Sequence, residues 1–226
     1  VVNEKEVHDG LKTDMKARLC LRGFQETEKP RSDSPTASRE LVRMALAIGA
    51  NEQWDAECLD VNAAFLQGSD IERDVFVEPP PEEKVDGEIW KLNKAAYGLY
   101  DSARLWYLKV IEKLEENGMT QLIGDEATYY YRVNDKVEGL IELHVDDFLA
   151  LGSKIFFDNV IANLKKEFKF SKIERNNFRF CGIDVKVKED GIYIDQNDYA
   201  NSINEIPVDQ NENIDRPLTK QEFKQY

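Results

Sequence analysis

The stretch LHVDDFLAL, residues 143–151, places two adjacent carboxylates, Asp146 and Asp147, in the middle of an apolar run. Gly-Leu-Ile-Glu at 139–142 extends this run toward the N-terminus. Burying one unpaired carboxylate is costly, and a second carboxylate beside it adds repulsion. The pattern therefore predicts strands at 139–143 and 148–151, joined by a tight turn at 144–147 that brings both aspartates to a sheet edge.

A third carboxylate, Asp60, lies in Leu59-Asp60-Val61 at the end of another apolar strand. Three carboxylates on neighbouring strands are what a pair of hard divalent cations requires, because Mg²⁺ prefers oxygen ligands. Two such ions can activate an attacking hydroxyl and stabilise a leaving oxygen. A solvated hairpin turn at Asp146-Asp147 and a strand-end cap at Asp60 explain the same residues without metal. The residues alone leave both interpretations open.

Periodicity and capping signals around this hairpin predict an α+β fold, with antiparallel hairpins and with helices covering one face of the sheet. The other predicted elements, in chain order, are a strand at 16–24 ended by Gly23, a helix opening at Pro35-Thr36, a strand from Glu57 that changes to helical composition at Asp60, a helix with Asp101 as N-cap and Asn117-Gly118 at its end, a helix capped by Ser153, and a hairpin of 178–187 with 192–194.

Length and composition indicate a globular chain. Its 226 residues suffice for one large domain or two small ones. Hydrophobic residues make up 42% and charged residues 33%, which argues against disorder. No apolar run approaches the roughly 20 residues of a membrane span, and the N-terminus is not a signal peptide. Because the chain starts without Met and stops without a closing element, we expect a piece of a longer protein.

Charge and cysteine content narrow the function classes. The net charge of −14 argues against a chain that binds nucleic acid through its overall charge. Residues 1–50 nevertheless carry nine Lys/Arg against eight Asp/Glu, so a basic contact surface is expected near the N-terminus. Three scattered cysteines without a CxxC pair indicate reduced thiols in a cytosolic setting, and two histidines make a His/Cys zinc site improbable.

A series of short motifs follows along the chain. They are Lys16-Ala-Arg-Leu-Cys-Leu-Arg-Gly-Phe24, Asp33-Ser-Pro-Thr-Ala-Ser38, Leu59-Asp-Val-Asn-Ala-Ala-Phe-Leu-Gln-Gly68, Val75-Phe-Val-Glu-Pro-Pro-Pro81, Trp90-Lys-Leu-Asn-Lys-Ala-Ala-Tyr-Gly-Leu99, Arg104-Leu-Trp-Tyr107, Leu143-His-Val-Asp-Asp147, Phe180-Cys-Gly182 and Ile194-Asp-Gln-Asn-Asp-Tyr199. Each motif is weak alone, but this order is highly specific. The series resembles the reverse transcriptase domain of copia-type LTR retrotransposons, part of a Pol polyprotein, from about residue 11 to the end.

The resemblance implies a right-hand polymerase fold with an antiparallel palm sheet covered by helices. It implies one fingers-palm domain over residues 1–226, with the thumb largely missing. The fingers would be mainly 1–55 and 70–100, and the palm mainly 56–69 and 101–200. No RNase H region follows, so the resemblance also implies a downstream RNase H region in the same polyprotein.

The implied activity is RNA-directed DNA polymerisation, with two Mg²⁺ (or Mn²⁺) ions as cofactors. Carried over residue by residue, Asp60, Asp146 and Asp147 match the catalytic aspartates. Asp60 and Asp146 would be the main metal ligands, Asp147 would be more peripheral, and the backbone carbonyl of Val61 would complete a site.

The resemblance also implies substrate contacts. Cations on the predicted 16–24 strand would hold the incoming triphosphate, a role that suits Arg and Lys donors. The Phe65 ring would pack under the sugar and exclude a ribose 2′-hydroxyl. The residues assigned to the nucleotide are Lys16, Arg18, Arg22, Val61, Phe65, Tyr97 and Gly98; those assigned to the primer end are His144, Cys181 and Gly182. Without the family context, these would be a solvated strand face, core aromatics and ordinary hairpin residues.

The implied partners are an RNA or DNA template with its primer and deoxynucleoside triphosphates, with no membrane, and the implied location is the cytoplasm, in virus-like particles. One departure is His144, where many members carry Tyr, which would make primer contact depend on pH between 5 and 8. A non-catalytic, retrotransposon-derived binding or structural module remains an alternative, since the chain is acidic. A palm-type nucleotidyl cyclase is a third possibility, but it needs neither a cationic fingers strand nor a primer-grip hairpin.

Overall fold

The protein is described by a computed structural model that covers residues 2–4, 15–17, 19–203 and 217. The helices are α1 (Arg39–Asn51), α2 (Ala64–Gln67), α3 (Ser102–Glu116), α4 (Lys154–Phe156), α5 (Ala162–Glu167) and α6 (Asn197–Ser202), with a π-helical segment, Phe157–Ile161, joining α4 to α5. The strands are β1 (Val2–Glu4), β2 (Met15–Ala17), β3 (Asp55–Val61), β4 (Phe76–Val77), β5 (Trp90–Lys91), β6 (Met119–Gln121), β7 (Thr128–Val133), β8 (Lys136–His144), β9 (Asp147–Gly152), β10 (Phe170–Arg175), β11 (Asn177–Phe180), β12 (Ile183–Lys188) and β13 (Gly191–Asp195).

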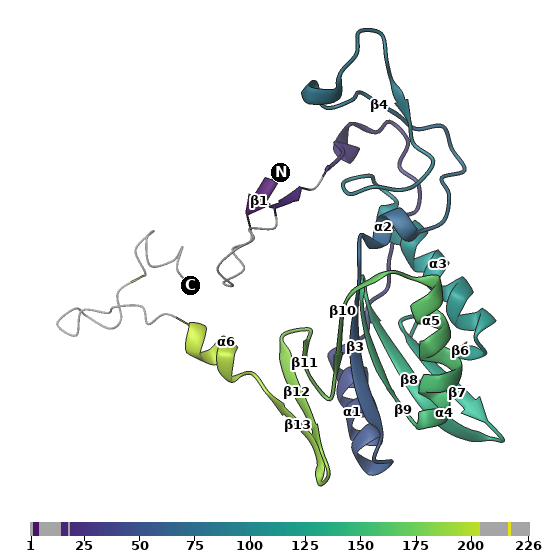
Figure 1. Ribbon diagram of the computed structural model, residues 1–226, viewed down its shortest axis with the longest axis vertical. Coiled ribbons are helices and arrows are strands. Elements are labelled where there is room, and N and C mark those ends of the chain that lie inside the picture. Colours follow the sequence, from purple (N-terminus) through teal and green to yellow (C-terminus); the bar gives the residue numbers. More distant parts are fainter. Residues whose placement is uncertain (1, 5–14, 18, 204–216, 218–226) are drawn as a thin grey trace.

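Six strands form the central sheet in the order β10-β3-β9-β8-β7-β6, and every neighbouring pair in it is antiparallel. A three-stranded sheet, β11-β12-β13, lies beside it, and β4 pairs with β5 in the upper part of the molecule (Figure 1). The prediction of an α+β fold built from antiparallel hairpins is confirmed.

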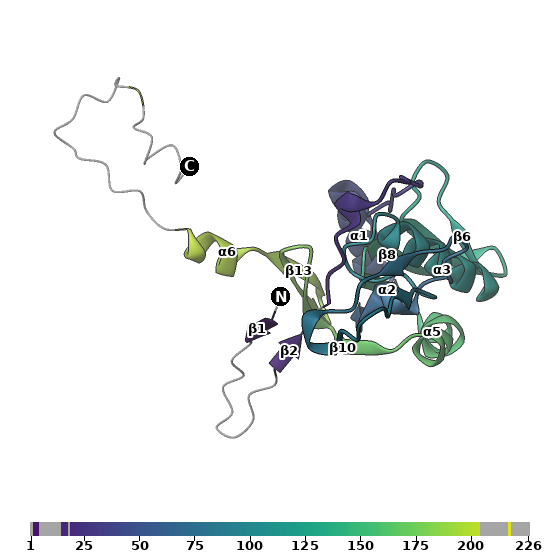
Figure 2. The ribbon, with the colours of Figure 1, turned by 90° about the horizontal axis from the view of Figure 1, so that it is seen from above.

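Helices cover both faces of the central sheet, so the prediction of one covered face is wrong. On one face, α3 and the α4–α5 segment pack against Leu59, Ile141 and Phe148. On the other face, α1 and the three-stranded sheet pack against Cys58 and Leu149. Seen from above, α1 and α5 lie on opposite sides of the sheet (Figure 2). Strands buried on both sides explain why 139–151 is apolar almost throughout.

A pair of glycines lets α4 begin directly over the sheet. Gly139 on β8 and Gly152 on β9 are register partners. A Cβ atom at either position would lie 2.2 Å from the ring of Phe156, so no side chain fits there. Ser153 caps the helix by accepting a hydrogen bond from the backbone N–H of Phe156, which confirms the predicted cap.

The upper part of the molecule has its own small core. Val75, Ala95 and Leu99 form a buried cluster there. Arg73 ties this part to the start of α3, because its Nη2 donates to Glu26 Oε2 at 2.8 Å and to Asp101 Oδ1 at 3.0 Å. Asp101 occupies the predicted N-cap position of α3, but its side chain makes no cap hydrogen bond and binds Arg73 instead.

Two strand predictions are wrong in their extent. In place of the predicted 16–24 strand, β2 ends at Ala17 and Gly23–Gln25 forms a 3-10 turn. The predicted 178–187 strand is split into β11 and β12 by a turn at Cys181-Gly182. Both turn residues have left-handed φ angles, 48° and 77°. The alternation of apolar and polar residues continues through this turn, so periodicity alone did not reveal it.

Candidate active site

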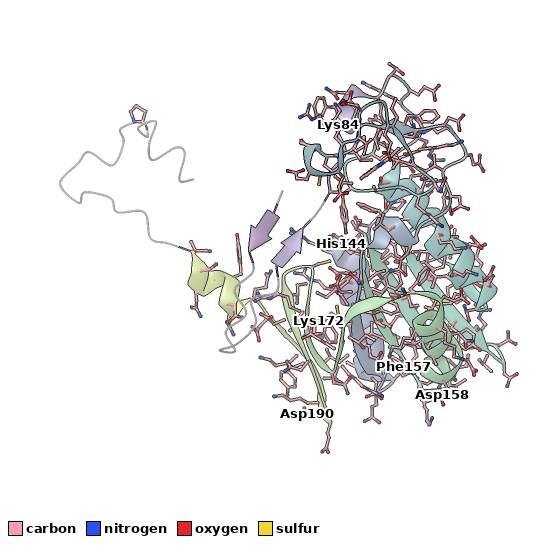
Figure 3. The ribbon with its side chains drawn as sticks, turned by 45° about the horizontal axis from the view of Figure 1, so that its top comes forward. Lys84, His144, Phe157, Asp158, Lys172 and Asp190 are labelled. Carbon is pink, nitrogen blue, oxygen red and sulfur yellow. The ribbon has the colours of Figure 1, made fainter. Side chains whose placement is uncertain are left out.

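Four side chains form a row across the ends of four strands. Asp60 on β3 is the register partner of Asp147 on β9, which is in turn the partner of His144 on β8. On the other side, Asp60 is the partner of Lys172 on β10. Register partners in antiparallel strands project from the same face. We call Lys172, Asp60, Asp147 and His144 the cross-strand row. In Figure 3, His144 lies between the part that carries Lys84 and the sheet that carries Lys172.

The turn between β8 and β9 is two residues long, Val145 and Asp146, as the sequence predicted. Val145 has a φ of 57°, an unusual left-handed conformation for a β-branched residue. Both carbonyls of the turn accept hydrogen bonds. The backbone N–H of Val61 donates to Asp146 at 2.9 Å, and the indole N–H of Trp106 donates to Val145 at 2.7 Å. The turn is therefore fixed from β3 on one side and from α3 on the other.

The carboxylates interact strongly enough to change one another's protonation. Burial raises the pKa of Asp147 to about 6, and the nearby charges of Asp146 and Asp60 raise it further in the same direction, while His144 opposes them. The hydroxyl of Ser171 donates a hydrogen bond to Asp60 Oδ2. The row and the turn thus gather three carboxylates whose charges repel one another at one sheet edge.

The donor set matches a hard divalent cation in its chemistry. Carboxylate oxygens are the ligands that Mg²⁺ prefers, and a cation would relieve the repulsion that raises the pKa of Asp147. As the side chains are arranged, no three Asp, Glu, His or Cys residues in the described part of the chain surround a metal position. The residues fit the ion in type without forming a closed site.

Phe65 and Tyr97, both predicted nucleotide contacts, are in contact with each other. Their ring centroids are 4.9 Å apart, with ring planes tilted by 57°. Phe65 lies on α2, five residues after Asp60. The structure therefore brings this aromatic pair to the end of β3, next to the strand residue that enters the row.

The segment around Arg22 lies against Tyr97 and Gly98. The backbone N–H of Leu21 donates to Tyr97 at 2.7 Å, and that of Gly23 donates to Gly98 at 3.0 Å. Gly98 has a φ of 89°, and a Cβ there would lie 2.1 Å from the Leu21 carbonyl oxygen, so only glycine fits. Arg22 is exposed beside this contact.

Two of the three predicted triphosphate cations are not tested in the same way. Lys16 belongs to β2, opposite Asn3, but its side chain is outside the described part. Arg18 lies outside the described residues altogether. The structure therefore places only the exposed side chain of Arg22 among them.

The predicted primer contacts lie together beside the carboxylates. The rings of His144 and Phe180 are 6.3 Å apart in an edge-to-face arrangement. Cys181 and Gly182 form the turn that follows Phe180. Burial raises the pKa of the Cys181 thiol to about 11, and the Asp147 carboxylate raises it too, which places the thiol close to the row.

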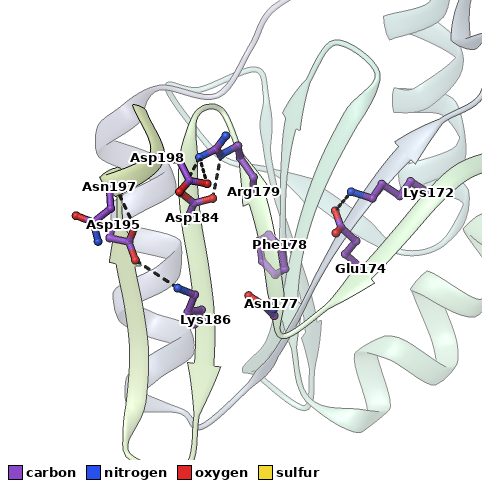
Figure 4. A pocket seen from close by; sticks show the side chains of 10 residues that line it. All are labelled: Lys172, Glu174, Asn177, Phe178, Arg179, Asp184, Lys186, Asp195, Asn197 and Asp198. Atoms are coloured by element: carbon purple, nitrogen blue, oxygen red, sulfur yellow. Dashed lines mark hydrogen bonds and ion pairs between the residues drawn. The ribbon is translucent and has the colours of Figure 1, made fainter. Parts of the chain in front are cut away.

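A polar pocket of about 520 Å³ opens next to Lys172, between β10 and the three-stranded sheet (Figure 4). Each of its three cations already pairs with a carboxylate: Lys172 with Glu174, Arg179 with Asp184 and Asp198, and Lys186 with Asp195. The pocket therefore presents balanced charge and no preference for an anion.

Sequence reasoning missed several residues that support the site. Trp106 was noted only as part of a motif, and Ser171 not at all, because their partners are distant in the chain. Glu142 carried a signal, an acidic residue inside an apolar strand. Its side chain is fully buried, Thr128 Oγ1 donates to its Oε2 at 2.7 Å, and its Oε1 has no hydrogen-bond partner among the described residues.

Glu142 predicts a pH-dependent stability. Burial raises its pKa to about 7; the Thr128 hydrogen bond lowers it, and the Asp125 charge raises it. Because the folded protein binds this proton more tightly than the unfolded chain, stability falls as pH rises from about 4.5 to about 7. We expect Glu142→Gln to match the wild type in urea unfolding at pH 5 and to be more stable by about 2 kcal/mol at pH 8.5.

Glu126, which is exposed, supplies the control for that comparison. Glu126→Gln should change the unfolding free energy equally little at both pH values. A Glu142→Gln effect of the same size at pH 5 and pH 8.5 would show that the buried carboxyl is charged throughout this range.

The comparisons with known proteins identify the family. The family model described as reverse transcriptase (RNA-dependent DNA polymerase) matches residues 1–220. The chain belongs to this family. Its curated relatives are Pol polyproteins of copia-type retrotransposons, as the sequence motifs indicated.

Three of these relatives show how much is shared. The chain is 28% identical over 208 residues to the Retrovirus-related Pol polyprotein from transposon RE1 of Arabidopsis thaliana, covering 88% of this chain and 14% of the polyprotein. The polyprotein from transposon TNT 1-94 of Nicotiana tabacum is 32% identical over 156 residues, 66% of this chain and 11% of its own length. The Transposon Ty1-ER2 Gag-Pol polyprotein of Saccharomyces cerevisiae is 27% identical over 158 residues, 68% of this chain and 9% of its own length.

This chain thus spans about one-seventh or less of each of these polyproteins. Among solved structures, a Candida tropicalis apo telomerase truncated from the C-terminal domain aligns with 72% of this chain and 41% of its own, at 10% identity and a TM-score of 0.44. None of the described helices has the length and apolar character needed to cross a membrane.

Proposed function

We propose that this chain is the RNA-directed DNA polymerase domain of a copia-type retrotransposon, and that it transfers nucleotides from deoxynucleoside triphosphates to a primer 3′-hydroxyl. The observation that supports this most is the pairing of Asp60 with Asp147 in register, directly beside the Val145-Asp146 turn. It brings the three aspartates of the family motifs to one sheet edge in a chain that belongs to the reverse transcriptase family.

Asp60 and Asp146 would hold two Mg²⁺ or Mn²⁺ ions, with Asp147 at the periphery and the backbone carbonyl of Val61 as a further ligand. When bound, such ions lower the pKa of an attacking hydroxyl and stabilise the charge on a leaving pyrophosphate. The chain's own contribution is to hold these oxygens at one sheet edge. Three repelling carboxylates remain there because the hydrogen bonds of the turn fix the backbone beneath them.

The remaining site residues would bind and orient the substrates. The guanidinium of Arg22, with Lys16 and Arg18, would pair with the phosphates of the incoming nucleotide. The Phe65–Tyr97 ring pair, with Gly98 beside it, would lie under the sugar and close the space that a 2′-hydroxyl needs. The turn at Cys181-Gly182 and the His144 ring would contact the primer end.

The proposed domain is a single fingers-palm unit, with fingers mainly at 1–55 and 70–100 and palm mainly at 56–69 and 101–200. The separate core around Val75 and Leu99 supports this division. The proposed partners are an RNA or DNA template with its primer and a downstream RNase H region. The proposed location is the cytoplasm, in virus-like particles.

Primer extension on an oligo(dT)-primed poly(rA) template tests the proposal, with Mg²⁺ or Mn²⁺ and the wild type beside an Asp146→Asn/Asp147→Asn variant. We expect extension by the wild type and none by the variant. Equal extension by both proteins would rule out these aspartates as the catalytic residues. A folded wild type that extends no primer, even with the downstream region of the polyprotein restored, would favour the non-catalytic module, for which the net charge of −14 is the supporting observation.

Phe65 provides a test of sugar selection. Phe65→Ala removes the ring next to Tyr97 and opens the space where a ribose 2′-hydroxyl would clash. Steric discrimination of this kind is worth a factor of about 10 to 200. We expect the ratio of kcat/KM for dTTP to that for UTP to fall by about 10- to 100-fold.

The control for Phe65 is Phe76→Ala, which removes an exposed aromatic ring from β4. This variant should keep the wild-type ratio. A Phe65→Ala protein that discriminates as well as the wild type would assign sugar selection to another residue.

A further inference from the structure

Trp106 connects α3 to the turn that carries the aspartates. Its side chain is fully buried, and its indole N–H donates to the carbonyl of Val145 at 2.7 Å. The ring also packs against two aromatic residues. It stacks on Phe148 with centroids 6.3 Å apart, and it meets Phe168 edge-on at 5.0 Å. These contacts hold the indole in one orientation, so its single donor points at the turn.

The turn needs such a contact because of its backbone conformation. Val145 is β-branched and has a φ of 57°, which sterically disfavours the left-handed region. A residue held in this region persists only where its surroundings enforce it. Two hydrogen bonds do so here, the Trp106 bond to Val145 and the Val61 bond to Asp146 at 2.9 Å. The first comes from outside the sheet and is made by a side chain.

The same tryptophan also lies against the end of α2. A Cβ at Gly68 would lie 3.2 Å from the Trp106 Cα and backbone nitrogen, so the two backbones are in close contact there. Gly68 ends the helix that carries Phe65. Trp106 therefore touches both the turn with the aspartates and the segment that follows Asp60.

We propose that Trp106 is a positioning residue for the nucleotidyl-transfer reaction, and that its indole N–H holds the Val145-Asp146 turn in the conformation that presents Asp146 beside Asp60. This inference rests on the proposed polymerase function. Trp106 touches neither substrate nor metal ligand side chains in this proposal. Without its N–H, Val145 relaxes toward negative φ and the carboxylates at the turn lose their fixed placement.

Trp106→Phe removes the donor and keeps an aromatic ring in the core. Tyr107→Phe is the matched control, because it removes a donor from the neighbouring residue of α3. Tyr107 is also buried, and its hydroxyl donates to the carbonyl of Glu126 at 2.7 Å, away from the turn. Both variants therefore lose one hydrogen bond to a backbone carbonyl, but only one of those carbonyls belongs to the turn.

We expect Trp106→Phe to lower kcat by about tenfold or more, with a smaller change in the KM for dTTP. We also expect it to weaken Mn²⁺ binding, followed by electron paramagnetic resonance, and to speed amide hydrogen exchange in residues 143–148. Tyr107→Phe should leave metal binding and exchange at 143–148 unchanged. Equal effects of the two variants on these measurements would reduce Trp106 to a core residue and overturn the proposal.

Two further variants keep the test decisive if Trp106→Phe does not fold. Benzothienylalanine at position 106 replaces the indole N–H by sulfur in nearly the same shape, and should reproduce the losses. Val145→Gly removes the backbone strain, so the loss on adding Trp106→Phe in that background should be smaller than in the wild type. An undiminished loss there would contradict the proposed mechanism.

The readouts separate this inference from the proposed function. Mn²⁺ binding and amide exchange report on the turn whether or not the chain extends a primer. A wild type that binds Mn²⁺ without extending primers would overturn the polymerase activity alone. Unchanged binding and exchange in Trp106→Phe of an active enzyme would overturn the positioning role alone.

Discussion

Asp60→Asn is expected to reduce primer extension by about a thousandfold or more while leaving the fold at least as stable as the wild type. The rate should fall because an amide neither carries the charge nor supplies the second oxygen that a metal ligand needs. Stability should not fall, because Asp60 is one of the charges that raise the pKa of Asp147, and its removal relieves repulsion at the sheet edge. The Asn side chain still accepts the hydrogen bond from Ser171.

Single-turnover extension and thermal unfolding of the same preparations measure the two effects. Asp86→Asn is the control, since it removes the same charge from an exposed position in the upper part of the molecule. It should leave the rate unchanged. An Asp60→Asn protein that is inactive because it has unfolded would contradict the expectation, as would one that retains its full rate.

Arg73→Met is expected to lower the free energy of unfolding by about 3 to 5 kcal/mol. The guanidinium pairs with Glu26 and Asp101, whose side chains are only 14% and 9% exposed. Methionine leaves both carboxylates largely buried without their cation. The Glu26 carboxylate also accepts the backbone N–H of Tyr100 at 2.8 Å, so the loss reaches the segment around Tyr97 and Gly98.

Urea unfolding with Lys91→Met as control checks this expectation. Lys91 pairs with Asp74 at the surface, where both side chains are more than half exposed, and such a pair contributes about 0 to 1 kcal/mol. If Arg73→Met costs no more than Lys91→Met, the three charges do not act as a buried unit. Adding Glu26→Gln and Asp101→Asn to Arg73→Met should recover part of the loss, because the unpaired charges are then gone.

The hairpin and its two aspartates could be predicted because their signal is local. An apolar run interrupted by Asp146-Asp147 allows few placements other than a turn, and Ser153 marks the helix start beyond it. Asp60 was placed at a strand end for the same reason. Its pairing with Asp147 required only that the two strands be neighbours, which the family resemblance supplied.

The contacts that fix the site could not be predicted in this way. β10 pairs with β3 across more than a hundred residues, and nothing in either strand specifies its partner. The helical spacing of α3 indicates that Trp106 is buried, but not that its N–H meets Val145. Alternation continues through Cys181-Gly182, so a two-residue turn in left-handed conformation looked like the middle of a strand.

The register of β3, β9 and β8 has a consequence for damaged copies of the gene. Asp60 and Asp147 continue the same alternation that sends Cys58 and Leu149 into the core. One codon gained or lost in the middle of β9 would turn every side chain beyond it to the opposite face. Such a copy would lose its core packing together with its carboxylates. We expect it to be degraded as an unfolded chain, so it would not persist as a folded, inactive competitor for template and primer.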